Sequence, residues 1–159
     1  MGGYRNVQKI LFSAAEFCTE FVYVLQPDFD KNLYLFDKKL KTYYSDWSSH
    51  TAQMTSYDFF RICKRLREGG TIKDFVIFKA HPIRRSSDPR IHPIDSPINQ
   101  HEYDRSKHPV KPMHIRLKDV YENIGLLLIL KDDFSADDSL KKICRGGKVI
   151  YDSRNIKNI

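Results

Sequence analysis

The sequence predicts a single α+β domain with a mixed β-sheet that contains hairpin strands, flanking helices and one C-terminal βαβ unit. Three observations lead to this fold class. Apolar residues at helical spacing alternate along the chain with short runs of β-branched and aromatic residues. The most apolar run, GLLLIL at 125–130, is followed at short intervals by a helical pattern and a last β-prone run, as in a βαβ unit. A chain of 159 residues suits one domain spanning 1–159.

The first elements follow from local spacing. Apolar residues recur at helical intervals over 7–18, which predicts a helix. The run FVYVL is rich in β-branched and aromatic residues, so we expect a strand over 21–26. Two short β-prone runs at 33–36 and 40–44 flank a polar turn, and this arrangement predicts a hairpin.

The middle of the chain carries helix-boundary signals. Thr55 or Ser56 is suited to cap a helix with one apolar and one basic face, and Gly69-Gly70 is suited to end it. The run DFVIFKA at 74–80 is apolar at successive positions, which predicts a strand that is covered on both faces inside a sheet.

The C-terminal part is expected to alternate strand and helix: a short strand at 113–117, a short helix at 117–124, a central strand at 125–130, a helix capped by Ser135, and a last strand at 148–152. Gly146-Gly147 ends the second of these helices. The polar residues 153–159 are expected to form a flexible tail.

The three cysteines, Cys18, Cys63 and Cys144, lie far apart, and their number is odd. This usage is typical of a reduced protein, so we expect an intracellular location, cytoplasmic or nuclear. Their positions on apolar faces predict core residues and not nucleophiles. No apolar run is long enough to span a bilayer, so we expect no membrane partner.

Residues 81–112 are predicted to form a long basic loop, rich in His and Pro, inserted between strands. They hold six of the seven prolines, which disfavour a helix or an inner strand. Between Lys79 and Lys118, nine Lys or Arg stand against four Asp or Glu, so most of the formal net charge of +7 is local. A local positive charge concentrates the field on one surface and favours a polyanionic partner.

We therefore expect a small nucleic-acid-binding protein whose basic loop contacts the phosphates of DNA or RNA. The expected contact residues are Arg84, Arg85, Arg90, Arg105 and Lys107 in the loop, and Lys64 and Arg65 on the basic helix face. One alternative is a solvated loop with no ligand. Another is a protein-interaction module whose loop orders on a protein partner.

Five of the six histidines lie between His81 and His114, at successive gaps of eleven, nine, seven and six residues. Structural zinc sites use histidines about three to five residues apart, so this spacing selects no metal site. His81, at the end of the expected inner strand, is the best single candidate for a ligand. A structural hydrogen bond is the plainer interpretation of a lone histidine there.

Five aspartates lie near expected strand ends and are candidates for catalysis: Asp28, Asp30, Asp74, Asp132 and Asp133. Carboxylates that converge from strand ends bind Mg²⁺, which clamps phosphates or activates water. Beside a basic loop they would form a metal-dependent nuclease or a nucleotidyl-transfer enzyme, with Mg²⁺ as the cofactor. The alternative is that these short acidic pairs only shape turns. The sequence leaves open whether the protein is an enzyme.

The acids Asp28 and Asp30 ahead of a strand, Asp74 much later, and the closing run LKKICRGGKVIYDS are weakly similar to minimal nucleotidyltransferase domains. The resemblance implies that the three acids bind magnesium. The chain departs from that family because the Gly-Ser turn ahead of the acids is absent and FSAAEF stands in its place. The strand expected at Phe21–Leu25 also conflicts with the family pattern, so the chain is not assigned to it.

Overall fold

The computed structural model describes residues 3–42, 45, 52–97, 106–107, 110–134, 137–144 and 146–158. The helices are α1 (Gly3–Phe17), α2 (Asn32–Asp37), α3 (Ser56–Glu68), α4 (Asp137–Ile143) and the 3-10 helix η2 (Ser153–Asn158). The strands are β1 (Phe21–Pro27), β2 (Leu40–Thr42), β3 (Asp74–Arg85), β4 (Ile91–Pro93), β5 (Arg116–Ile129) and β6 (Lys148–Asp152).

Four strands form the main sheet in the order β1-β5-β3-β6, and β2 pairs with β4 in a second sheet. All of these neighbouring pairs are antiparallel, so the expectation of a mixed sheet is wrong. β5 and β6 nevertheless run parallel to each other, because each is antiparallel to β3, which lies between them. Joined through α4, they form the predicted C-terminal βαβ unit, and the α+β fold class is confirmed.

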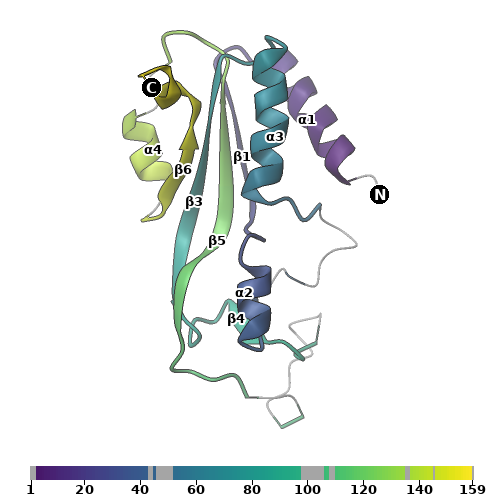
Figure 1. The fold of residues 1–159 in the computed structure, drawn as a ribbon, viewed down its shortest axis with the longest axis vertical. Coiled ribbons are helices and arrows are strands. Elements are labelled where there is room, and N and C mark those ends of the chain that lie inside the picture. Colours follow the sequence, from purple (N-terminus) through teal and green to yellow (C-terminus); the bar gives the residue numbers. More distant parts are fainter. Residues whose placement is uncertain are drawn as a thin grey trace.

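Helices cover the main sheet on both faces, with α1 and α3 on one face and α4 on the other (Figure 1). Alternation along β3 builds the two apolar layers. Phe75 and Ile77 pack toward α1 and α3, whereas Val76 and Phe78 pack toward α4. The inner position of β3 confirms the prediction for 74–80.

Beyond the helical layers, β3 and β5 continue together as a two-stranded ribbon to the end of the molecule where α2 and β4 lie (Figure 1). A separate small core packs there, formed by Leu35, Leu40, Ile83, Ile91, Leu117 and Val120. These side chains come from α2, from both strands of the small sheet and from the ribbon itself. The small core therefore holds the end of the ribbon in a fixed position.

The hairpin predicted over 33–44 is wrong. Residues 32–37 form the helix α2, and β2 pairs with β4 much later in the chain. The helical turn buries Leu35 completely and leaves Leu33 and Phe36 exposed to solvent. The partner of β2 is distant in sequence, so no local pattern reveals the true pairing.

The short helix predicted over 117–124 is also wrong, because β5 runs without interruption from Arg116 to Ile129. Within this stretch Leu117, Val120 and Ile124 are buried, while the charged positions are exposed or half-buried. β3 supplies an extended partner along nearly the whole of β5, and this tertiary pairing outweighs the local helical pattern.

Part of the segment 81–112 is strand, since β3 continues to Arg85 and a later piece forms β4. Pro82 is tolerated in β3 because β6 pairs only with 76–79 and leaves that side of the strand open. Residues 98–105 and 108–109 of the segment lie outside the described residues.

The residues expected to form a tail make the 3-10 helix η2. The Ser153 hydroxyl is buried, accepts a hydrogen bond from the Phe75 N–H at 2.8 Å and donates one to Asp74 at 2.9 Å. This side chain ties the start of η2 to the beginning of β3.

The boundary signals of α3 are confirmed. The Thr55 hydroxyl accepts from the Asp58 N–H at 3.2 Å, and the Asp58 carboxylate accepts from the Thr55 N–H at 3.0 Å.

Of the cysteines, Cys63 and Cys144 are buried as predicted. Cys18 is exposed instead, because α1 ends one residue before it.

Gly125 allows β5 to pass beneath an aromatic ring. Phe78 lies opposite Gly125, and a Cβ atom at residue 125 would lie 2.1 Å from the Phe78 Cζ. We expect Gly125→Ala to lower the free energy of unfolding by about 1–3 kcal/mol, the usual cost of overpacking a core. Urea unfolding followed by circular dichroism measures this change.

The control is the same substitution in a Phe78→Leu background, where the ring is absent. We expect Gly125→Ala to cost clearly less there, because the atoms that it would meet are gone. An equal cost in both backgrounds would show that the ring is not the reason for the glycine.

Candidate functional site

Four cations gather where the ribbon of β3 and β5 ends, and we call this surface the basic end: Arg84, Arg85, Arg116 and Lys118. Arg85 lies directly opposite Arg116 in the strand register, so their Cα atoms are about 5 Å apart. All four side chains are exposed. Antiparallel pairing therefore concentrates positive charge from two distant parts of the sequence on one small surface.

The cations of the basic end form no ion pair in the part of the chain that the structure describes. The nearest acid in sequence, Asp119, is bound to Lys148 at 2.8 Å, and Lys148 lowers the pKa of Asp119 more than Lys118 does. Like charges directly opposite each other destabilise an antiparallel pair, so Arg85 and Arg116 carry a cost that the fold does not offset locally.

Another predicted contact residue, Arg90, is committed to internal contacts. Its guanidinium donates to both Asp88 carboxylate oxygens, at 2.8 and 2.7 Å, and to Glu122 at 2.8 Å. Hydrogen bonds from Arg90 lower the pKa of Asp88. Lys111 is likewise used internally, since its ammonium donates to the backbone carbonyls of Asp88 and Ile91 at 2.7 Å each.

The remaining predicted contact residues do not join the basic end. Lys64 and Arg65 are exposed on α3, whose last turn is held to the start of β3 by an ion pair between Arg67 and Asp74 at 3.2 Å. The basic end lies at the other end of β3, about 30 Å away at the usual rise of a strand. Lys107 is exposed. Arg105 lies outside the described residues.

The pair Asp28 and Asp30, expected to bind a metal, surrounds a lysine instead. The Lys79 ammonium lies 2.6 Å from a carboxylate oxygen of each aspartate, and Lys79 is 4 % exposed. The Asp30 carboxylate also accepts from the Ser56 N–H at 2.8 Å and from the Ser56 hydroxyl. We call Asp28, Lys79 and Asp30 the buried charge cluster.

Burial and hydrogen bonding act in opposite directions on the two aspartates of this cluster. Burial raises the pKa of Asp28, although the Lys79 ammonium acts to lower it. Burial would also raise the pKa of Asp30, but hydrogen bonds from Lys79 and Ser56 outweigh it and lower that pKa. The better-bonded Asp30 is therefore the carboxylate that holds its negative charge more firmly.

The other three aspartates lie far from this cluster. Asp74 stands five residues before Lys79 on β3, about 17 Å away at the usual rise of a strand, and it pairs with Arg67. Asp132 and Asp133 are exposed and pair with Lys73 at 3.6 Å and Lys131 at 3.8 Å. The structure thus brings only Asp28 and Asp30 together.

His81 forms a structural hydrogen bond. Its Nδ1 lies 2.8 Å from the Asn123 side-chain oxygen, which only accepts, so Nδ1 carries the proton. Its backbone has a φ of 57°, a left-handed conformation that non-glycine residues seldom adopt. Across the described ranges, no group of three or more His, Cys, Asp or Glu side chains is placed to hold a metal ion.

Sequence reasoning missed Lys79, Arg116 and Lys118 as members of these sites. Lys79 was recognisable, since a lysine in a strand buried on both faces requires acidic partners. Arg116 and Lys118 were counted in the predicted local charge but not among the contact residues, because only the strand register shows that they lie beside Arg84 and Arg85.

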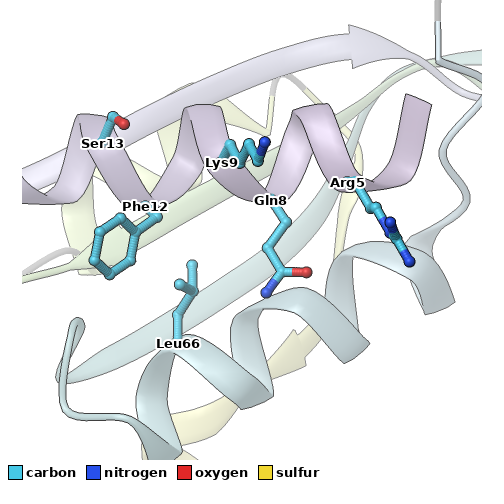
Figure 2. A pocket seen from close by; sticks show the side chains of 6 residues that line it. All are labelled: Arg5, Gln8, Lys9, Phe12, Ser13 and Leu66. Atoms are coloured by element: carbon cyan, nitrogen blue, oxygen red, sulfur yellow. The ribbon is translucent and has the colours of Figure 1, made fainter. Parts of the chain in front are cut away.

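A hollow of about 430 Å³ lies between α1 and α3. Figure 2 shows that Gln8 and Phe12 of α1 and Leu66 of α3 extend into the space between the two helices, while Arg5 lies near one end of it. Its lining combines the apolar side chains of Phe12 and Leu66 with basic and polar side chains of α1.

Compared with protein-family models, curated proteins and solved structures, the chain matches none of them. The described helices include none that is both long and apolar enough to cross a bilayer.

The buried charge cluster leads to a testable prediction about the free energy of unfolding. We expect Lys79→Met to lower the free energy of unfolding by about 3–5 kcal/mol, because it leaves two carboxylates close together without a cation. The loss should shrink as the pH is lowered toward 4, since protonation of the carboxyl groups removes their repulsion. Urea unfolding at a series of pH values measures both effects.

The matched control is Lys148→Met, which removes a lysine from the exposed pair with Asp119. We expect a small change with little pH dependence, because water solvates both members of that pair. Equal losses for the two variants would mean that the cluster does not stabilise the fold through its charges.

Proposed function

We propose that this protein binds nucleic acid and that the basic end contacts the phosphates. The observation that carries the proposal is the pairing of Arg85 opposite Arg116, neither of which forms an ion pair with a described residue. A phosphate bound between them would offset the repulsion that the strand register imposes. Arginine suits this role because its planar guanidinium donates two hydrogen bonds to a phosphate.

The rest of the charge distribution supports the same surface. Lys79, Arg90 and Lys111 belong to the basic stretch of the sequence, yet each is bound to the protein's own oxygens. Within the described part of this stretch, the exposed strand cations are therefore gathered at the basic end. The three free cysteines fit a reducing, intracellular location, which is part of the proposal.

Two other functions receive less support. A metal-dependent nuclease or nucleotidyl-transfer enzyme would have to displace Lys79 from Asp28 and Asp30 before Mg²⁺ reached them. A protein-interaction module would use the part of 81–112 that lies outside the described residues.

The proposal predicts a defined change in salt dependence. We expect the double variant R84A/R85A to bind nucleic acid more weakly and to reduce the slope of log K against log salt by about 1.4–1.8, or about 0.7–0.9 for each lost phosphate contact. Fluorescence anisotropy with labelled DNA and RNA at several salt concentrations gives the slopes. Recovery of intact nucleic acid after incubation with Mg²⁺ is expected, and cleavage would favour the enzyme.

The charge-matched control is K64A/R65A, which removes two exposed cations from the opposite end of β3. We expect its slope to match that of the unmodified protein. The proposal fails if neither DNA nor RNA binds, or if the two double variants lose the same affinity and slope.

A further inference from the structure

The short helix α2 and its flanking lysines lie directly beside the basic end. The Tyr34 hydroxyl accepts a hydrogen bond from the Lys118 N–H at 3.1 Å. Tyr34 also packs on the small core that contains Ile83 and Leu117, which are the sequence neighbours of Arg84 and Arg116. Any polyanion on the basic end therefore passes close to this helix.

In α2, aromatic rings and lysines are paired on the surface. The ammonium groups of Lys31 and Lys38 lie 5.5 and 4.8 Å from the centre of the Tyr34 ring, and that of Lys39 lies 5.6 Å from the centre of the Phe36 ring. Phe36 is 53 % exposed and is not part of the small core. Phe36 therefore meets solvent beside Lys39, whereas the Tyr34 ring is half-buried against the small core and lies under Lys31 and Lys38.

The local fold holds this arrangement in place. Leu35, at 0 % exposure, anchors α2 in the small core, and the next residue of the helix points Phe36 outward. The N–H groups of Lys38 and Lys39 donate to the carbonyls of Leu35 and Phe36, at 2.9 Å each, and end the helix. Lys38 and Lys39 stand at the C-terminus of α2, where the helix dipole favours cations.

We infer that Phe36 forms a stacking platform for an unpaired base and that the ligand of the basic end is a single-stranded nucleic acid. The inference rests on the proposed function and adds the class of nucleic acid. Phosphate contacts alone do not distinguish single strands from duplexes, because both present phosphates. An exposed ring favours the single strand, because the bases of a duplex are already stacked on one another while those of a single strand offer a free face.

The combination of rings and lysines fits a single strand in a second way. Proteins that bind single strands place aromatic rings for the bases beside cations for the backbone. Here Lys31, Lys38 and Lys39 supply cations at the platform, and the basic end continues the positive surface. A base that stacks on Phe36 would displace the Lys39 ammonium, which then reaches a neighbouring phosphate.

The first experiment uses the unmodified protein and three probes with the same number of phosphates per strand. These are a single strand of about fifteen thymidines, a duplex, and a single strand of abasic sites. In anisotropy measurements we expect the thymidine strand to bind most tightly. The affinity of the abasic strand should be lower by at least roughly 5- to 150-fold, which is the contribution of one stacked base.

The second experiment uses Phe36→Ala, with Leu33→Ala as the matched control on the same helix, because Leu33 is 80 % exposed and has no ring. We expect Phe36→Ala to weaken binding of the thymidine strand roughly 5- to 150-fold while leaving the salt slope and the affinity for the abasic strand unchanged. Leu33→Ala should change none of these, and Phe36→Trp should restore or improve binding. Circular dichroism verifies that each variant is folded.

The outcomes separate the two proposals. Salt-dependent binding that is equal for the thymidine, abasic and duplex probes would overturn the stacking platform and leave the phosphate contacts of the basic end standing. Unchanged binding of the thymidine strand by Phe36→Ala would overturn it as well. Failure of all three probes to bind at low salt would overturn the proposed function itself.

Discussion

The pairing of β3 with β5 is the constraint on which the rest of the structure depends. It begins with Asp74 opposite Ile129, where α3 and η2 are attached, and ends with Arg85 opposite Arg116. Because it extends past both helical layers, the same pair of strands carries the main core at one end and the small core at the other. The basic end exists only because this register brings two stretches of sequence together.

One charged residue of β3 fixes how other parts of the chain join this strand. Lys79 binds the two aspartates that follow β1, and one of them, Asp30, binds Ser56 at the first turn of α3. A single ammonium group therefore links β3, the segment after β1 and the start of α3. This role explains why a lysine stands in an otherwise apolar strand, and why the two aspartates that resemble metal ligands in the sequence face a cation of the protein itself.

The parts of the fold that the sequence predicts well are those with local signals. The spacing of α1, the β-branched run of β1, the cap at Thr55 and the apolar run of β5 needed no distant partner. The hairpin at 33–44 and the helix at 117–124 failed because β4 and β3, respectively, decide those conformations from elsewhere in the chain. The candidate site divides in the same way: composition located Arg84 and Arg85, whereas Arg116 and Lys118 join them only through register.

The cations behind the net charge of +7 therefore fall into two groups with different roles. Lysines and arginines that bind the protein's own oxygens stabilise the fold, so substituting them is expected to change the free energy of unfolding. Those of the basic end raise the energy of the folded state, because Arg85 and Arg116 are held opposite each other. A polyanion that binds there binds the folded chain better than the unfolded one, so it relieves this repulsion and stabilises the fold at the same time. On the proposed function, binding and stability would therefore be coupled through one strand pair, and each would report on the other.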